Sequence, residues 1–422
     1  MGEIWIDGRI PLSGQVQIQG SKNAALPMMA AALLHDGVTI LHRCPRIADV
    51  YAMEKILISL GVKTNWERHT LTLDCRKIKG SEITGKYAES MRSSVILMGS
   101  MLSRMQKVRI VYPGGCTIGK RPIDLHLRVL QAMGARFEED NGELLASCEA
   151  RMKGTDIEFP FSSVGATENG LLAAVKAKGI TRLKNCAAEP EICHLCRFLQ
   201  AMGAEIRGIG TRELEIRGVQ ALRNVEYTVP TDRIVAGTYL FAAAATRGIV
   251  ELLEAPVEEM GAVLRVYEKM GGQWESKGVK LRADSRKIQH PISQIETACY
   301  PGFPTDMQSI LMSVLLTVKG ESRITEQIFE DRYKIVPQLK KMGANVCIAG
   351  REALIRGNGE LKGARVEAEE LRGGAALIVA GLAAEGRTII QNSCFIERGY
   401  EDIGYDLSCL GGRIQIKEQV DR

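Results

Sequence analysis

Apolar residues recur along this chain in short helical segments that are rich in small side chains. Because these segments are apolar nearly all round, rather than along one stripe, we expect them to be buried on every side. Most are followed by a glycine and a β-branched strand, as at Gly37-Val38-Thr39-Ile40. The six segments are Asn23–Leu34, Met91–Arg104, Ala166–Ala177, Arg233–Arg247, Met307–Val318 and Leu371–Ala384.

A second motif repeats with the same period. A hydrophobic residue, a glycine and a small residue close a helix-like pattern ahead of a β-rich run, as in Met342-Gly343-Ala344. The glycine is expected just past the helix end, where the backbone turns left-handed. Each unit therefore reads as a buried helix, a strand, an amphipathic helix and further strands. The six glycines, 68 to 73 residues apart, are Gly61, Gly134, Gly203, Gly271, Gly343 and Gly411.

Six units divide naturally into three plus three. A proline interrupts a strand-like run at Thr228-Val229-Pro230, and residues 4–18 look like strands that could complete the second half. An open solenoid is the alternative, but the units are long and neither end resembles a polar cap. We predict an α/β fold with helices inside and sheets outside, built twice. One domain would span 22–230, and the other would combine 1–21 with 231–422.

Composition narrows the class of protein. The 422 residues are 45% hydrophobic and 25% charged, which is typical of a globular chain. A run of 18 uncharged apolar residues is absent from the sequence, and Glu3 and Asp7 replace the basic start of a signal peptide. Eleven cysteines, several in apolar helical contexts, favour a reduced cytoplasmic protein over a disulfide framework. Cys193 and Cys196 have the spacing of a metal or redox pair, but without a second pair nearby we favour inert thiols.

The formal net charge is +5, a mild excess that suits small anionic substrates. It does not indicate nucleic-acid binding, because Lys and Arg form no block with interleaved aromatics and aromatics are only 5% of the chain. We expect no membrane contact and no obligate protein partner.

One loop carries the clearest chemistry, the segment PGGCTIGKRPIDLH at 113–126. Glycines allow backbone N–H groups to approach an anion closely, and Lys120 and Arg121 can hold a phosphate or carboxylate. A thiol beside fixed positive charge, here Cys116, has a lowered pKa and becomes a usable nucleophile or acid. A surface glycine turn with an incidental cysteine is the plainer interpretation.

Motifs across the chain resemble the family of UDP-N-acetylglucosamine 1-carboxyvinyltransferases, which are enolpyruvyl transferases. The motifs follow one another at the spacing of that family and cover essentially the whole chain. They are GSKNAALP at 20–27, MRSS at 91–94, the loop at 113–126, SVGATEN at 163–169, GFPTDMQ at 302–308, IFEDR at 328–332 and ERGYE at 397–401. The resemblance implies two inside-out α/β barrels with the active site in the cleft between them.

The reaction that this resemblance implies is the first committed step of peptidoglycan synthesis, and so serves cell wall growth and cell division. An enolpyruvyl group passes from phosphoenolpyruvate to the 3′-hydroxyl of UDP-N-acetylglucosamine, and phosphate leaves. This addition and elimination needs an acid for C3 of the alkene, a base for the sugar hydroxyl and cations around the carboxylate and phosphate. It calls for no metal and no redox cofactor.

The resemblance also implies roles for single residues. Lys22 at the start of the first buried helix would bind phosphate, which helix N–H groups also favour. Cys116 would act as general acid or form a covalent adduct, and would be attacked by epoxides such as fosfomycin. Asp306, whose plainer role is a helix N-cap, would be the general base. Arg398 would complete the catalytic set.

Further residues would bind the substrates. Arg121 would clamp phosphoenolpyruvate. Arg92 and Arg332 would add positive charge, although each has a plainer interpretation as a salt-bridge partner. The residues expected around the nucleotide sugar are Asn23, Pro122, Ile123, Asp124, Leu125, Ser163, Val164, Gly165 and Ile328.

Four positions depart from the family pattern. Glu370 stands where an aspartate is frequent, Asp331 replaces a commoner asparagine, Phe161 takes the place of a basic residue near the nucleotide, and His194 stands where an acidic residue is often seen. These departures put fine contacts in question rather than the reaction.

Three other functions fit parts of the pattern. A synthase of 5-enolpyruvylshikimate 3-phosphate would share the fold and the carbon donor but lacks such a cysteine loop. A secondary-metabolism enolpyruvyl transferase would act on another nucleotide. A non-catalytic nucleotide-sugar-binding paralogue is the third, and the joint presence of Lys22, Cys116, Asp306 and Arg398 argues against it.

Overall fold

A computed structural model describes residues 2–112 and 123–417, and it divides them into two compact units. The first unit runs from Gly20 to Pro230, and the second combines the residues up to Gln19 with those from Thr231 onward. Each unit has its own hydrophobic core. The predicted site residues Cys116, Arg121 and Pro122 lie outside the described residues.

Three helices in each unit are buried along nearly their whole length, as their uniform apolar pattern predicts. Two of the predicted segments begin with a turn of 3₁₀ helix: η1 (Arg92–Ile96) precedes α4 and η3 (Thr305–Met307) precedes α10. These buried helices are α1 (Lys22–Ala32), α4 (Leu97–Met105), α6 (Val164–Ala174), α8 (Arg233–Thr246), α10 (Gln308–Leu316) and α12 (Leu371–Ala383).

A second set of helices shows a buried and an exposed face. They are α2 (Ala48–Ser59), α5 (Asp124–Ala132), α7 (Pro190–Ala201), α9 (Gly261–Lys269), α11 (Val336–Lys341) and α13 (Ile403–Cys409). Each ends two residues before one of the six repeat glycines, whose φ angles are all positive, between +79° and +106°. The glycines therefore take the left-handed position past each helix end, where a side chain would be strained. Shorter helices are α3 (Lys86–Ser90), η2 (Val257–Glu259) and η4 (Ser393–Phe395).

The described residues form six four-stranded sheets, and all six have the same pattern. An edge strand runs parallel to its neighbour, and the next two strands pair antiparallel. In the first unit the orders are β14 (Val225–Thr228), β3 (Val38–His42), β5 (Thr70–Asp74), β4 (Lys63–Glu67); β6 (Glu82–Ile83), β7 (Lys107–Val111), β9 (Glu143–Ser147), β8 (Arg136–Asp140); and β10 (Asp156–Glu158), β11 (Ile180–Lys184), β13 (Glu213–Arg217), β12 (Glu205–Arg207).

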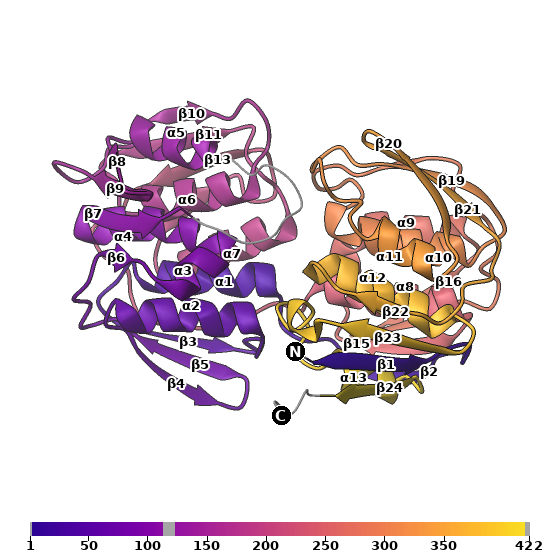
Figure 1. Cartoon of the computed structure of the whole chain (residues 1–422). Coiled ribbons are helices and arrows are strands. Elements are labelled where there is room, and N and C mark those ends of the chain that lie inside the picture. Colours follow the sequence, from indigo (N-terminus) through magenta and orange to yellow (C-terminus); the bar gives the residue numbers. More distant parts are fainter. Residues whose placement is uncertain (1, 113–122, 418–422) are drawn as a thin grey trace. The chain divides into compact units, whose positions relative to one another are not determined.

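The second unit repeats this pattern with strands from both ends of the chain. Its sheets are β22 (Arg365–Glu367), β23 (Arg387–Gln391), β1 (Glu3–Asp7), β24 (Arg413–Lys417); β2 (Ser13–Gln17), β15 (Ile249–Leu253), β17 (Lys280–Asp284), β16 (Gln273–Lys277); and β18 (Ile295–Glu296), β19 (Gly320–Thr325), β21 (Glu352–Gly357), β20 (Asn345–Ala349). The indigo strand β1 lies between the yellow strands β23 and β24 (Figure 1), with Ile4 paired to Ile390 and Ile416.

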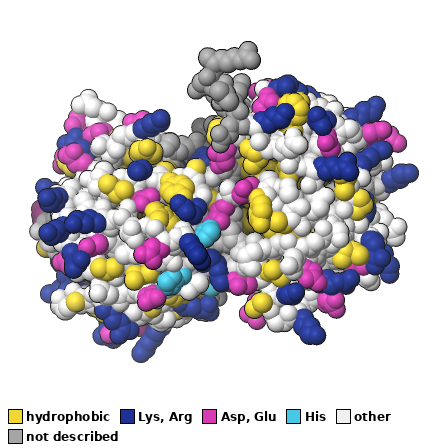
Figure 2. Space-filling model, turned by 90° about the horizontal axis from the view of Figure 1, so that it is seen from below, with side chains coloured by type: hydrophobic (Ala, Val, Ile, Leu, Met, Phe, Trp, Pro, Cys, Tyr) yellow, Lys and Arg dark blue, Asp and Glu magenta, His cyan; other side chains and the backbone are white. Residues whose placement is uncertain are grey.

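In most strands more buried residues alternate with more exposed ones, so one face of each sheet covers the buried helices while the other meets solvent. On the face of the molecule seen in Figure 2, Lys and Arg side chains are interspersed with Asp and Glu. The prediction of an α/β fold built from six repeated units is confirmed.

Candidate active site

Lys22 lies at the N-terminus of α1 in the first unit. Ser21 caps this helix, its hydroxyl accepting the N–H of Ala24 at 3.4 Å. The Lys22 ammonium lies 2.7 Å from Oδ2 of Asp49 on α2, and the two side chains are only 14% and 8% exposed. A cation at a helix N-terminus is opposed by the helix dipole, so the Asp49 carboxylate offsets an unfavourable location. Asn23, beside Lys22, is half-buried.

The N-termini of α5 and α6 lie against each other, and together they carry most of the predicted nucleotide contacts. Gly165, in the first turn of α6, faces the His126 ring of α5 so closely that a Cβ there would lie 2.8 Å from its Cε1. Asn169 of α6 lies 2.8 Å from Nδ1 of the same ring. The structure therefore brings the predicted segments 123–125 and 163–165 together.

These two helix starts expose different groups. Ile123 and Leu125 turn their side chains into the core, while Asp124 and Val164 are exposed. Ser163 is the N-cap of α6 and accepts the N–H of Ala166. What this surface offers a ligand is thus mainly the Asp124 carboxylate and the N–H groups of a helix start, which favour anions.

Asn169 also ties the helix that Arg92 opens to this part of the unit. Its side chain donates to the Val95 carbonyl at 3.0 Å and accepts the Gly99 N–H at 2.8 Å. Arg92 itself is half-buried at the first residue of η1. One buried amide therefore holds η1 and α4 against α6.

Asp306 in the second unit is held by two buried arginines. Arg332 donates to Oδ1 at 2.8 Å, and Arg372 donates to Oδ2 through Nε at 3.2 Å and a terminal nitrogen at 2.9 Å. The arginine side chains are 2% and 5% exposed, whereas Asp306 is 28% exposed. Buried arginines thus hold the Asp306 carboxylate by hydrogen bonds, while part of the carboxylate remains accessible to solvent.

Arg372 and Glu370 both come from the start of α12. Glu370 is the N-cap: its carboxylate accepts the N–H groups of Arg372 and Gly373. Burial would lower the pKa of Arg372, but the charge of Asp306 and a hydrogen bond to it raise that pKa above its ordinary value. Arg372 therefore stays charged, and its contact with the Asp306 carboxylate offsets the cost of burying the guanidinium.

Arg398 belongs to a loop that is anchored at Tyr400. The buried Tyr400 hydroxyl is 2.8 Å from Oγ1 of Thr238 on α8. The Gln19 side chain holds the loop on either side, donating to the Gly399 carbonyl at 3.2 Å and accepting the Glu401 N–H at 2.9 Å. This arrangement fixes the backbone immediately after Arg398.

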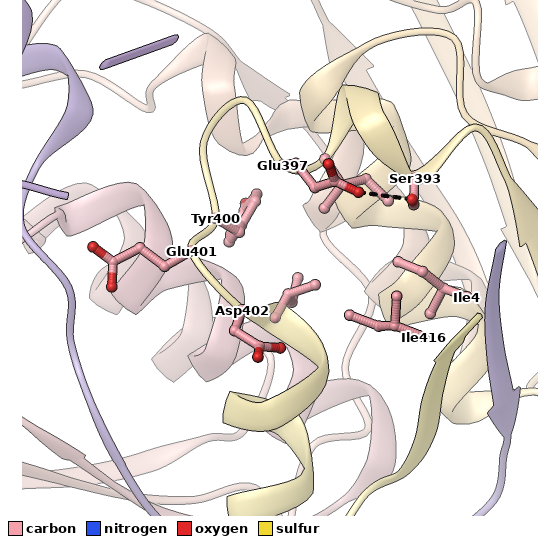
Figure 3. A pocket seen from close by; sticks show the side chains of 9 residues that line it. Ile4, Ser393, Glu397, Tyr400, Glu401, Asp402 and Ile416 are labelled. Atoms are coloured by element: carbon pink, nitrogen blue, oxygen red, sulfur yellow. Dashed lines mark hydrogen bonds between the residues drawn. The ribbon is translucent and has the colours of Figure 1, made fainter. Parts of the chain in front are cut away.

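A small pocket that this loop helps to form is lined by isoleucines and three acidic residues, and it is a poor match for an anionic substrate. Figure 3 shows Glu397, Glu401 and Asp402 around it, with Glu397 accepting a hydrogen bond from Ser393 at 2.8 Å. We therefore do not place phosphoenolpyruvate there.

Several described cysteines are poor nucleophiles. Burial raises the pKa of Cys75 to about 12 and that of Cys186 to about 11, and it raises the pKa of Cys196 further. Among the described residues, no group of three or more His, Cys, Asp and Glu side chains could hold a metal ion.

Sequence reasoning missed Asp49, His126, Asn169 and Arg372. A signal existed for two of them, since Asn169 and Arg372 are polar residues within helices that are buried on nearly every side. Asp49 and His126 lie on helices that are partly exposed, where a charge or an imidazole is ordinary. Their importance appears only when the helices are packed.

Comparison with known proteins identifies the family. The sequence profile of EPSP synthase (3-phosphoshikimate 1-carboxyvinyltransferase) matches residues 6–407. A UDP-N-acetylglucosamine 1-carboxyvinyltransferase 2 of Caldanaerobacter subterraneus subsp. tengcongensis is 43% identical and covers 98% of this chain and 99% of its own. A UDP-N-acetylglucosamine 1-carboxyvinyltransferase 1 of Symbiobacterium thermophilum is 45% identical, with coverage of 97% and 94%. The chain belongs to the UDP-N-acetylglucosamine 1-carboxyvinyltransferase family.

Solved structures agree on the fold of this carboxyvinyltransferase-family chain. The enolpyruvyl transferase NikO from Streptomyces tendae superposes with a TM-score of 0.88 over 99% of both chains at 22% identity. An EPSP synthase from Acinetobacter baumannii gives a TM-score of 0.77 at 18% identity, over 99% of this chain and 100% of that one. At such identities the likeness concerns the fold alone.

Membership of the carboxyvinyltransferase family makes this chain a transferase, as the sequence motifs predicted. Of the four departures, Glu370 acts as the cap of α12, Asp331 lies 4.0 Å from the Lys334 ammonium and the Phe161 side chain is 60% exposed. His194 is half-buried on α7. In the described part of the chain, helices of the length and hydropathy needed to span a membrane are lacking.

Proposed function

We propose that the chain transfers the enolpyruvyl group of phosphoenolpyruvate to the 3′-hydroxyl of UDP-N-acetylglucosamine with release of phosphate. The observation that carries this proposal is the identity of 42% to 45% with carboxyvinyltransferases of that name, over 97% or more of this chain. This substrate pair would make the reaction the first committed step of peptidoglycan synthesis. The ion pairs that Arg332 and Arg372 make with Asp306 support a role for this carboxylate in the reaction.

The addition step forms a bond between the sugar 3′-oxygen and C2 of phosphoenolpyruvate. Asp306 takes the hydroxyl proton, while Cys116 delivers a proton to C3, which leaves a tetrahedral phosphoketal. Arg332 and Arg372 hold the Asp306 carboxylate in one orientation, and a general base needs such a fixed oxygen within hydrogen-bond reach of the hydroxyl. The distance between Asp306 and the sugar oxygen in a complex would test this assignment directly.

The elimination step reverses one proton transfer and breaks the bond between C2 and the phosphate oxygen. C3 loses a proton, the carbon double bond re-forms and inorganic phosphate leaves with its electron pair. Developing negative charge on phosphate would be stabilised by Lys22, Arg121 and Arg398. Arg92 and Arg332 add to the positive charge, and no step requires a metal or a redox group.

The nucleotide would be bound by the paired helix starts of α5 and α6. The N–H groups at the start of α6, around Ser163, Val164 and Gly165, support this placement, because helix N–H groups suit a diphosphate, and Asp124 would border the uridine. Asn23, Pro122, Ile123, Leu125 and Ile328 complete the proposed contacts. The candidate residues thus come from both units of the chain.

We also propose that the protein is cytoplasmic and that its binding partners are small molecules only. Eleven cysteines, several of them buried, support a reducing compartment rather than a disulfide framework. The two alternative enolpyruvyl transfers are less well supported, because the solved structures that represent them are 22% and 18% identical to this chain, against 42% to 45% for the carboxyvinyltransferases.

The decisive experiment measures phosphate release from phosphoenolpyruvate. We expect release that requires UDP-N-acetylglucosamine, persists in excess chelator and is lost in the Asp306→Ala variant. The chemically matched alternative acceptor, shikimate 3-phosphate, should support no turnover. Equal turnover with that acceptor, or loss of activity on chelation, would contradict the proposed function.

A further inference from the structure

Glu326 is a fully buried carboxylate that the proposed mechanism does not use. It follows β19 directly, its exposed fraction is 0%, and its segment lies in the orange part of Figure 1. Burying an ionised carboxylate is costly unless hydrogen bonds replace its hydration. The chain therefore keeps a carboxyl group at a position where burying an apolar residue would cost less free energy.

Four hydrogen bonds converge on this carboxylate. Oε1 accepts from the Thr297 hydroxyl at 2.9 Å and from the N–H groups of Ile328 and Phe329 at 2.8 Å and 3.1 Å. Oε2 accepts from the Thr305 hydroxyl at 2.9 Å. Such bonds to a charged acceptor are about twice as strong as neutral ones, so the three segments that supply them are held firmly together.

The segments joined in this way carry the candidate site. Thr305 directly precedes Asp306, and Ile328 is a proposed nucleotide contact. Arg332 donates to Asp306 and packs its guanidinium 5.5 Å from the centre of the Phe329 ring. The contacts form a closed circuit that runs from Glu326 through Thr305, Asp306, Arg332 and Phe329 back to Glu326.

We propose that Glu326 is a positioning residue that sets the place of Asp306 from the Thr305 side and that of the Ile328 backbone from the other. This inference rests on the proposed role of Asp306 as general base. Glu326 touches neither substrate in this scheme and acts only through the groups it holds. Its effect is geometric rather than electrostatic.

Two substitutions at this position separate geometry from charge. In Glu326→Gln the amide oxygen can keep the bonds to Thr297, Ile328 and Phe329, while the amide nitrogen donates to a rotated Thr305 hydroxyl. We expect kcat to remain within about fivefold of the wild type, the equivalent of about one neutral hydrogen bond. In Glu326→Ala all four bonds are lost, and kcat should fall on the order of 100-fold, as for a reacting group displaced by about an ångström.

A third variant removes only the bond on the Asp306 side. Thr305→Val keeps the shape of the side chain, and kcat should fall by about tenfold, the loss of one hydrogen bond to a charged group. KM for phosphoenolpyruvate should stay unchanged in all three variants. KM for UDP-N-acetylglucosamine should rise in Glu326→Ala, because the Ile328 backbone is released.

The matched control is Glu54 on α2, another buried glutamate that accepts a threonine hydroxyl, that of Thr64, at 2.7 Å. Glu54→Ala should lower the Tm in the same way as Glu326→Ala but leave kcat and both KM values unchanged.

Amide hydrogen exchange supplies a readout that does not depend on activity. The N–H groups of Ile328 and Phe329 should be protected in the wild type and in Glu326→Gln, and should exchange rapidly in Glu326→Ala, or in Glu326→Asp if the alanine variant does not fold. Wild-type enzyme without nucleotide-sugar-dependent phosphate release would refute the proposed function, while the exchange result would still decide the role of Glu326.

Three results would overturn the inference. They are a folded Glu326→Ala variant with wild-type kcat, a Glu326→Gln variant as slow as Glu326→Ala, and unchanged protection of the Ile328 and Phe329 amides in Glu326→Ala.

Discussion

At the scale of single residues, the proposed chemistry depends on charges that are held in pairs. Asp306 is fixed by Arg332 and Arg372, and Lys22 by Asp49. A planar guanidinium supplies two N–H groups in fixed directions, so it sets the orientation of a carboxylate as well as its charge. Lysine offers a point charge instead, which makes the exchange of Arg for Lys an informative test.

Arg372→Lys should lower kcat by about tenfold, since it replaces the two-point contact with Oδ2 by a single ammonium contact worth one charged hydrogen bond less. KM for phosphoenolpyruvate should change little. Arg387→Lys is the control, because Arg387 also makes two hydrogen bonds to one carboxylate, with Nε donating to Oδ1 and a terminal nitrogen to Oδ2 of Asp7, on an exposed part of β23. Steady-state kinetics of both variants would check this, and a wild-type rate for Arg372→Lys would refute the positioning of Asp306 by Arg372.

Glu168 in α6 should make stability depend on pH. Burial, reinforced by the charges of Glu191 and Glu189, raises the pKa of Glu168 from 4.5 to about 8. A raised pKa means that the stabilising contribution is complete below pH 4.5 and is lost as the pH rises through about 8. Glu168→Gln should therefore raise the Tm near pH 8 and have little effect on it near pH 5. The control Glu158→Gln, on the surface of β10, should leave the Tm unchanged at both pH values. Thermal unfolding across this range is the measurement, and a parallel shift at both pH values would contradict it.

At the scale of elements, helix starts carry the proposed functional groups. Lys22 opens α1, Asp124 opens α5, Ser163 caps α6 and Glu370 caps α12 two residues before Arg372. The first turn of a helix has N–H groups without helical partners, so caps and anionic ligands meet there. Stability and site geometry are consequently coupled at these positions.

Glu370→Ala should lower the free energy of unfolding by about 1 kcal/mol, the usual effect of losing an N-cap. It should also lower kcat, because the first turn of α12 carries Arg372. Glu370→Asp can restore the cap and should recover most of both properties. Urea unfolding combined with the phosphate-release assay would test this, and a loss of stability with an unchanged rate would separate α12 from the site.

At the scale of the whole molecule, reactive and inert cysteines should be distinguishable among the eleven in the chain. Burial keeps thiols such as those of Cys75 and Cys186 protonated near neutral pH, since it raises their pKa. Cys116 lies next to glycines and close to Lys120 and Arg121 in the sequence, which should make it the first thiol to be alkylated.

Mass spectrometry after brief alkylation should therefore locate the label on Cys116. Alkylation of Cys116 should be faster when UDP-N-acetylglucosamine is present. Cys116→Asp should retain turnover, because a carboxyl group can donate the proton, and should resist the epoxide fosfomycin. Initial labelling at Cys347 or Cys394, which are exposed, would contradict this assignment, as would full sensitivity of the aspartate variant.

The sequence by itself determined the repeated architecture. Helices that are apolar all round have to be buried, and a glycine after each amphipathic helix permits the left-handed turn that ends it, so both features depend on neighbours along the chain. The described residues bear this out at all six repeats, with the change that two buried helices begin as 3₁₀ turns at Arg92 and Thr305. Family motifs then indicated the reaction and its residues.

Tertiary structure alone decided which charges meet. Arg332 and Arg372 reach Asp306 from 26 and 66 residues away, and Glu326 joins segments around 297, 305 and 328. Local patterns cannot encode these pairings, because an arginine or glutamate beside an apolar segment has the same signature whether it is solvated or paired. The burial that makes such charges costly when alone, and strongly bonded when paired, arises only once the sheets close over the helices.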